Sequence, residues 1–296
     1  MKELVIISGK GGTGKTSITA SFAALAKGES VLADCDVDAA DLHLILKPEI
    51  SCRTEFRSGH KAIVSKEKCV GCGKCVRVCR FSAVGVNADV SPNEGVTYHI
   101  DDIACEGCGV CVRFCPEGAI EFPEEVCGEW FVSRTRFGTM VHAKLGIAAE
   151  NSGRLVTLVR NRAKEIAQEQ KKEYVLIDGS PGIGCPVIAS LTAADAALIV
   201  AEPTVSGDHD LRRIAGLTKQ LGVKTFVSVN KWDVNPDAAG KIKEFALSQN
   251  LQFAGMARYD KAVTDSQRLQ KAVVECCSGG VAEDIRNIWN NVTGLW

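Results

Sequence analysis

The chain has 296 residues, 46% hydrophobic and 24% charged, and its 35 Lys and Arg nearly balance its 36 Asp and Glu. This length fits one large α/β domain with a smaller module. The net charge of −1 excludes binding to nucleic acid that is driven mainly by electrostatic attraction. No stretch approaches the eighteen apolar residues of a membrane span, and the apolar run after Met1 is too short for a signal peptide, so we expect a cytoplasmic protein that binds neither nucleic acid nor membrane.

The first elements along the chain are those of a parallel βαβ unit. Residues 3–8 form an apolar run that predicts a strand, and residues 16–27 carry apolar side chains at helical spacing. A second strand is predicted over residues 30–33 and ends at the acidic side chains of Asp34, Asp36 and Asp38. The parallel pattern stops near Pro48.

The turn after the first strand has the sequence of a phosphate-binding loop. It reads Gly9-Lys10-Gly11-Gly12-Thr13-Gly14-Lys15-Thr16 and matches G-x-x-x-x-G-K-[ST] between a strand and a helix. Glycines there let backbone N–H groups point at phosphate oxygens, and the helix N-terminus adds a partial positive charge. We expect Lys15 to reach the β- and γ-phosphates and Thr16 to bind Mg²⁺. Glycine-rich turns without a ligand are common, but the complete match in this context favours a nucleotide site.

Cysteine is the residue type that departs from an ordinary composition. The chain holds 14 cysteines, and eight of them lie between Cys69 and Cys115. In a reducing compartment, metal ligation explains such a number better than disulfides do. The run from Cys69 to Cys79 recurs from Cys105 to Cys115 with the same cysteine spacing, which indicates an internal duplication. A hairpin around residues 91–95 is predicted between the copies.

Both runs have the spacing C-x₂-C-x₂-C-x₃-C, which is typical of bacterial ferredoxins with two [4Fe–4S] clusters. In that pattern three cysteines of one run share a cluster with the fourth cysteine of the other. Zinc sites use two cysteine pairs separated by a longer loop, and this spacing fits them poorly. Arg80 follows the first run where proline is usual, but no ligand is lost. The predicted ligands are Cys69, Cys72, Cys75 and Cys115 for cluster one, and Cys79, Cys105, Cys108 and Cys111 for cluster two.

The α/β pattern then resumes. A helix is predicted over residues 155–167, strands over 174–177, 196–200, 225–229 and 252–256, and a closing helix over 281–292 that docks on the sheet. The cysteine-rich block is therefore an insertion. We expect a doubly wound, mostly parallel α/β P-loop sheet in residues 1–61 and 124–296, interrupted by an α+β ferredoxin domain in residues 62–123.

Lys10 makes the phosphate loop resemble a particular family. The order K-G-G-x-G-K-T is similar to the deviant Walker A motif of the MinD/ParA/Mrp ATPases, to which the nitrogenase iron protein is related. Asp34 to Asp38 resembles switch I, Asp178-Gly179-Ser180-Pro181-Gly182 resembles Walker B running into switch II, and Glu202 to Thr204 and Asn230-Lys231 resemble the base-side loops. The resemblance covers residues 1 to about 55 and about 125 to 296.

The resemblance implies an ATPase, slow without a partner, that forms a homodimer with ATP or a heterodimer with a related ATPase. Lys10 would cross to the partner's phosphates, Asp36 would position the attacking water beside Lys15, and Asp178 would hold Mg²⁺ through water. The implied nucleotide-binding residues are Gly9, Lys10, Gly11, Gly12, Thr13, Gly14, Lys15, Thr16, Ser17 and Asn230.

Two alternatives remain open. Asn230-Lys231-Trp232-Asp233 also fits the guanine-reading motif N-K-x-D, although the resemblance favours ATP. Cys185 lies where the nitrogenase iron protein has a ligand of its dimer-bridging cluster, but residues 146–153 supply no second cysteine. Cys185 is therefore either a thiol on the dimer face or a buried apolar residue. The cysteines expected to be simply buried are Cys35, Cys52, Cys127, Cys276 and Cys277.

The function predicted from the sequence is the coupling of Mg-ATP to two [4Fe–4S] clusters. A complete set of eight ligands favours ATP-gated electron transfer to a redox partner. A cluster scaffold or maturation factor that passes iron–sulfur units to an acceptor protein is the alternative. A spatial organiser like MinD, with clusters that sense redox state, is a third hypothesis.

Overall fold

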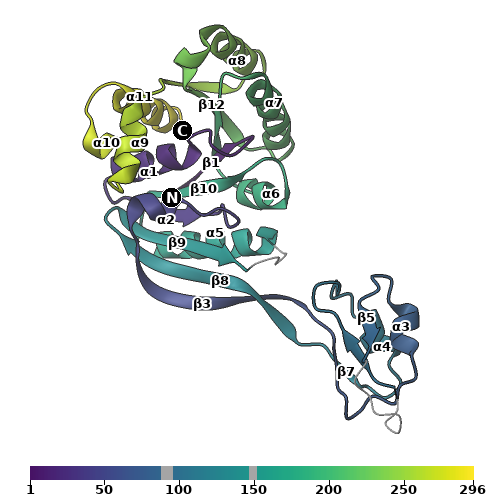
Figure 1. The fold of residues 1–296 in the computed structure, drawn as a ribbon. Coiled ribbons are helices and arrows are strands. Elements are labelled where there is room, and N and C mark those ends of the chain that lie inside the picture. Colours follow the sequence, from purple (N-terminus) through teal and green to yellow (C-terminus); the bar gives the residue numbers. More distant parts are fainter. Residues whose placement is uncertain (88–95, 147–151) are drawn as a thin grey trace. The chain divides into compact units, whose positions relative to one another are not determined.

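The computed structural model describes residues 1–87, 96–146 and 152–296. The chain divides into two compact units, one formed by Met1–Thr54 with Glu129–Trp296 and the other by Glu55–Gly128 (Figure 1). The second unit is thus an insertion in the first. The predicted turn at residues 91–95 lies outside the described residues.

Within the described residues, the large unit is built on a sheet of nine strands in the order β13-β12-β11-β1-β10-β2-β9-β8-β3. The chain enters this sheet at its centre, where β1 pairs in parallel with both β10 and β11. The strands are β1 (Lys2–Ser8), β2 (Ser30–Asp34), β3 (Glu49–His60), β8 (Glu124–Thr135), β9 (Gly138–Leu145), β10 (Tyr174–Pro181), β11 (Ala196–Ala201), β12 (Lys224–Asn230) and β13 (Gln252–Ala257).

Helices cover both faces of this sheet. Successive residues of a strand point to opposite faces, and Leu4, Val5, Ile6 and Ile7 of β1 are all fully buried. On one face Leu4 and Ile6 share a core with side chains of α1, α2, α10 and α11, while α5 to α8 contact the strands of the sheet. The helices are α1 (Lys15–Leu25), α2 (Leu42–Leu46), α5 (Ser152–Glu169), α6 (Cys185–Leu191), α7 (Val205–Gln220), α8 (Pro236–Ser248), α9 (Lys261–Arg268), α10 (Val273–Cys276) and α11 (Val281–Gly294), with a 3₁₀ turn at Trp232–Val234.

The small unit shows the duplication in its backbone. Strand β4 (Ile63–Val64) pairs with β7 (Ile120–Glu121), and β5 (Val84–Val86) pairs with β6 (Tyr98–Ile100), both antiparallel. Helices α3 (Lys74–Val78) and α4 (Val110–Phe114) follow the two cysteine loops. Their N-cap glycines, Gly73 and Gly109, have φ of 70° and 71°, and each helix ends at the fourth cysteine of its run. The predicted fold class is confirmed: a mostly parallel α/β sheet carries a separate α+β unit.

Three strands were not predicted. β3, β8 and β9 extend the sheet beyond β2, and β9, which follows the insertion, is parallel to β2. The first seven residues of β3 are exposed on both faces, so this strand lacks the alternation of apolar and polar residues by which strands are recognised.

Three of the cysteines expected to be buried differ from expectation. Cys52 and Cys276 are exposed and Cys277 is partly exposed, whereas Cys35 and Cys127 are buried as predicted. Cys52 lies in the exposed stretch of β3, and Cys276 is the last residue of the short helix α10. The closing helix α11 does bury its apolar stripe in the core. Among the described helices, none combines the length and apolarity that crossing a membrane would require.

Candidate functional sites

The glycine-rich loop ends in a helix whose first turn is uncapped. Gly14, the N-cap of α1, has φ of 90°, and no side chain caps the helix. The free N–H groups of that turn are the ordinary partners of an anion at a helix N-terminus. A Cβ on Gly14 would lie 2.3 Å from Asn230 Nδ2, and this amide donates a hydrogen bond to the Thr13 carbonyl at 2.7 Å. The end of β12 therefore braces the loop in its shape.

The loop lies where the order of the strands reverses. β1, which leads into it, has β10 on one side and β11 on the other, and in open α/β sheets ligands bind at the carboxyl ends of strands at such a point. Asp178 is in β10, Glu202 follows β11 and Asn230 ends β12. The fold thereby collects residues that are far apart in sequence.

Lys15 is at the centre of this group and is buried. Its Nζ lies 2.8 Å from Asp178 Oδ1 and 3.4 Å from Asp36 Oδ2. The other oxygen of Asp178 accepts a hydrogen bond from Thr16 Oγ1 at 2.8 Å. Thr19 Oγ1 lies 3.2 Å from Asp178 Oδ1. The structure thus brings together Lys15, Thr16, Asp36 and Asp178, four of the predicted site residues.

The charges in this group do not balance. Burial raises the pKa of Asp34 well above its usual value, and the nearby Asp178 carboxylate raises it further. Burial also raises the pKa of Asp36. Burial lowers the pKa of Lys15, but Asp178, Asp36 and Asp34 outweigh it and the net direction is upward. Three carboxyl groups therefore lie around one ammonium, and those of Asp34 and Asp36 are held less readily in the ionised form.

A divalent cation fits this cluster of carboxyl groups, because its positive charge would favour their ionised form. Mg²⁺ takes oxygen ligands and keeps several waters, so it is held by few protein groups together with phosphate oxygens. The hydroxyl of Thr16 and the carboxylates of Asp36 and Asp178 are oxygen donors of this kind. The residues present therefore fit the predicted magnesium site.

Lys10 contacts groups of its own chain. Its Nζ lies 3.1 Å from Glu202 Oε2 and within 3.5 Å of the hydroxyls of Thr204 and Ser206. The other oxygen of Glu202 pairs with Lys231 Nζ at 2.6 Å. Burial raises the pKa of Glu202, but hydrogen bonds from Lys231 and Lys10 outweigh it and lower the pKa. Glu202 is therefore an ionised bridge between two lysines.

Two other predicted positions have side chains engaged elsewhere. Ser17 Oγ accepts a hydrogen bond from Gln267 of α9 at 2.8 Å. Asp233 Oδ1, in the N-K-x-D sequence, accepts one from the backbone N–H of Tyr259 at 2.7 Å.

Cys185 is exposed and is the first residue of α6. Its Cβ would lie 3.4 Å from a Cβ built on Gly153. The exposed apolar residues Ile183 and Ile188 lie close to it in sequence. The prediction of a buried apolar role for Cys185 is therefore wrong, and its role as a thiol on a dimer face stays a prediction.

In the small unit, the four predicted ligands of cluster one line a single cavity. Cys69, Cys72 and Cys75 come from the first loop, and Cys115 comes from the end of the second run. Val64, Tyr98 and Ile120 complete an apolar wall, and the Ala119 N–H donates to Cys115 Sγ at 3.3 Å. Backbone donors to sulfur and an apolar wall are features that tune iron–sulfur clusters.

The thiols surround this space and do not meet at a point. No three His, Cys, Asp and Glu side chains of the described residues are grouped closely enough to hold one metal ion. A cluster that takes four thiolates spreads them around a larger object than a single ion does. The arrangement fits the crossed set of cysteines that the spacing predicts.

The second set has the same pattern. Cys105 and Cys108 lie close enough to Cys111 to act on it: burial raises the pKa of the Cys111 thiol, and these two neighbours raise it further. Burial likewise raises the pKa of the Cys75 thiol, and the neighbouring Cys69 and Cys72 raise it further. Cys79 ends α3 with φ of −75° and ψ of 117°, and Cys115 ends α4 with −74° and 114°. By this equivalence Cys79 is the counterpart of Cys115.

Thr19 was not predicted to belong to the nucleotide site, and Asp34 and Glu202 were predicted only as parts of segments that resemble switch I and a base-side loop. Asp34 carries one of the three carboxylates, Thr19 contacts Asp178, and Glu202 holds Lys10 and Lys231. Asp34 could have been found from the sequence, because it lies in the segment that resembles switch I. Thr19 could not, since its hydroxyl also bonds the Lys15 carbonyl as any helical threonine does.

The small unit matches a known family. Residues 68–126 match the 4Fe-4S dicluster domain. This span contains all eight cysteines of the duplicated runs.

Known proteins are similar to larger parts of the chain. The chain is 33% identical over 237 residues to the protein MJ0578 of Methanocaldococcus jannaschii, and the matched region covers 79% of this chain and 79% of MJ0578. It is 27% identical over 157 residues to the carbon monoxide dehydrogenase accessory protein CooC of Rhodospirillum rubrum, over 53% of this chain and 56% of CooC. Among solved structures, the cell division ATPase MinD of Pyrococcus furiosus has the same fold, with a TM-score of 0.58 and 16% identity over 100% of this chain and 99% of MinD.

Proposed function

The chain belongs to the family of P-loop proteins of the MinD/ParA fold that carry an inserted 4Fe–4S dicluster domain, and from that premise we propose that it is an ATPase whose nucleotide state controls electron transfer through two [4Fe–4S] clusters. The observation that carries the proposal is the presence, in one chain, of the Lys15–Asp36–Asp178–Thr16 group and of a cavity lined by four crossed cysteines.

The nucleotide site supports hydrolysis of Mg-ATP. Lys15 is paired with Asp178 and Asp36, and a nucleotide that attracts it to phosphate leaves two carboxylates to be neutralised. Thr16 and Asp178 would hold the metal, which supplies positive charge to the phosphates when bound. Asp36, at the rim of the group, is then free to accept a hydrogen bond from a water.

The hydrogen bonds of Asp233 and Lys231 favour adenine over guanine as the bound base. In the N-K-x-D motif the aspartate accepts hydrogen bonds from the base. Here Asp233 Oδ1 already accepts from the Tyr259 N–H, and Lys231 is held by Glu202 and by the Gly12 carbonyl. Lys231 therefore contacts the phosphate loop in this structure, and Asp233 bonds the backbone that follows β13.

The contacts of Lys10 supply a reason for dimerisation to depend on ATP. Lys10 is half-exposed and paired with Glu202 of its own chain, so it must leave this partner before it can reach the phosphates of a second subunit. We expect Lys10→Ala to abolish ATP-dependent dimerisation and to slow hydrolysis strongly, with both clusters retained. Light scattering with ATP and with ADP checks this; Lys47→Ala, at another exposed lysine, serves as the control.

A route from the nucleotide site toward the inserted unit runs through the sheet. Asp34 of β2 is in register with His142 of β9. The His142 ring lies 2.8 Å from Ser133 Oγ of β8 and stacks on Phe131 of the same strand. β8 is one of the two strands by which the chain passes between the units.

A second function, the delivery of iron–sulfur units to an acceptor protein, is favoured by the similarity to CooC, an accessory protein of carbon monoxide dehydrogenase. One experiment separates the two. Reduced protein is mixed anaerobically with an oxidised electron acceptor or with an apo-ferredoxin, each with ATP and with ADP, and its iron is counted afterwards. Electron loss with all iron retained supports electron transfer; iron that moves to the apo-protein with ATP supports delivery and contradicts our proposal.

A further inference from the structure

The two copies of the cysteine run carry opposite charge. Residues 66–80 of the first copy hold Lys66, Lys68, Lys74, Arg77 and Arg80 with the single acid Glu67, a net charge of +4. The equivalent residues 102–116 hold Asp102, Glu106 and Arg113, a net charge of −1. Since the two backbones are nearly the same, the second copy is an internal comparison for the first.

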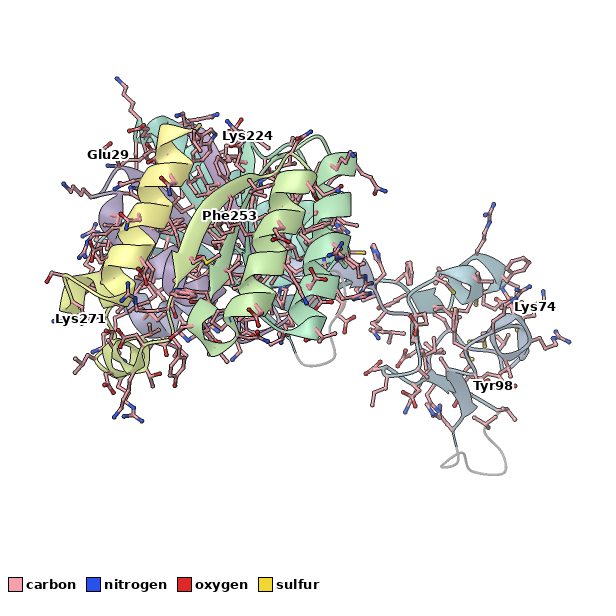
Figure 2. All side chains as sticks on the ribbon, turned by 90° about the horizontal axis from the view of Figure 1, so that it is seen from above. Glu29, Lys74, Tyr98, Lys224, Phe253 and Lys271 are labelled. Atoms are coloured by element: carbon pink, nitrogen blue, oxygen red, sulfur yellow. The ribbon has the colours of Figure 1, made fainter. Side chains whose placement is uncertain are left out.

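The cations of the first copy face solvent. All five are exposed, and within the described residues none forms an ion pair with a carboxylate. Lys74 itself lines the cluster-one cavity, and its side chain points outward in Figure 2. Glu117 is the only carboxylate among the residues that line the cavity. The charge is therefore available to a partner.

The same surface carries the exposed parts of the cluster-one site. Cys72 is exposed, and Val70 beside it is 65% exposed. An apolar centre with a charged rim is the composition of a weak, transient redox interface. At the positions of Val70 and Lys66 the second copy has Glu106 and Asp102, which would repel the same partner.

We propose that electrons enter or leave the protein at cluster one, through a partner protein with an acidic surface that docks on Lys66, Lys68 and Lys74. This inference rests on the proposed electron-transfer function. In the exchange, one electron passes from the reduced cluster to the partner's oxidised centre, with no proton or bond transferred. The acidic face of the second copy directs the partner away from cluster two, because like charges at an interface disfavour the complex.

The test uses the full-length protein with both clusters reduced, and two one-electron acceptors of opposite charge. An acidic [2Fe–2S] ferredoxin represents the proposed partner, and hexaamminecobalt(III) is the cationic comparison. We expect the rate constant with ferredoxin to fall about tenfold or more between low and 0.3 M ionic strength, as electrostatic steering predicts. The triple variant Lys66→Glu/Lys68→Glu/Lys74→Glu should lower the low-salt rate by a similar factor, while the rate with hexaamminecobalt(III) does not fall.

Controls keep the outcome specific. Lys219→Glu/Lys241→Glu/Lys261→Glu changes three exposed lysines and alters net charge equally, so its rate with ferredoxin should stay within about twofold of the unchanged protein at the same salt. Iron is counted in every variant, and glutamine replacements at the same three sites serve if clusters are lost. An equal fall in both triple variants, or no fall in the first, overturns the docking surface. Binding of a 20-nucleotide RNA through these lysines would do so as well. Oxidation by hexaamminecobalt(III) without steering of ferredoxin would leave the redox function standing and remove only this surface.

Discussion

At the residue scale, the roles of the carboxylates in the nucleotide site depend on how deeply each is buried and which groups it contacts. Asp178 is fully buried and held by Lys15, Thr16 and Thr19. Within the described part of the chain, the Asp36 carboxylate has one polar contact, to Lys15 at 3.4 Å, and the side chain is partly exposed. A buried and fully bonded carboxylate suits a structural and metal-binding role, whereas a carboxylate at the rim suits the positioning of water.

Asp36→Ala should therefore bind ATP but hydrolyse it about a hundredfold more slowly, which is the usual size of a positioning or acid–base contribution. Removing this charge reduces repulsion toward phosphate, so binding should be retained. ATP affinity and single-turnover hydrolysis measure the two effects. Asp38→Ala removes an exposed carboxylate two residues away and should change neither; a normal rate in Asp36→Ala would refute the assigned role.

Protonation of His142 makes the stability of the large unit depend on pH. Burial lowers the pKa of His142 to about 4 from 6.5, so the unfolded chain binds the proton first as the pH falls. The stability contributed by the neutral ring is full above pH 6.5 and is lost as the pH falls toward 4, by about 2 kcal/mol at pH 5. Urea unfolding at pH 7 and pH 5 should show this loss, and His142→Leu should lack it. His209→Leu, at an exposed ring, should keep it; the same loss in His142→Leu would contradict the assignment.

At the element scale, the unit that repeats is a glycine loop, a one-turn helix and a final cysteine. Because Cys115 from the second run lines the cavity of the first loop, Cys79 should serve the second. Cys79→Ser should damage cluster two and leave cluster one, from about eight iron per chain in the unchanged protein. Iron analysis with EPR of the reduced protein checks this, and Cys52→Ser, at an exposed cysteine outside both runs, should lose no iron. Loss of cluster one would refute the crossed ligation.

The same elements show what the sequence could and could not predict. The βαβ start, the strand that ends at Asp178 and both cysteine loops follow from local patterns of apolar residues, glycine and cysteine. β3 does not, because it is the edge strand and its first seven residues are exposed on both faces, so it has no hydrophobic period. The pairing of Glu202 with Lys10 and Lys231 depends on which strands are neighbours, and local sequence does not encode this.

At the scale of the whole molecule, the account requires that ATP and the electrons on the clusters affect each other. A nucleotide with equal affinity for two states shifts nothing. If ATP changes the reduction potential of a cluster, reduction must change ATP affinity by the same factor. Without such coupling, the nucleotide site and the clusters would function independently in one chain.

The most direct test of this coupling uses Asp36→Ala to hold the ATP state without turnover. The reduction potentials of both clusters are measured by EPR-monitored titration with ADP and with ATP, and the mass of the protein is determined in each state. We predict a dimer with ATP and a shift in at least one potential, where about 59 mV corresponds to a tenfold coupling for one electron. Identical potentials and identical mass in the two nucleotide states would contradict the central claim.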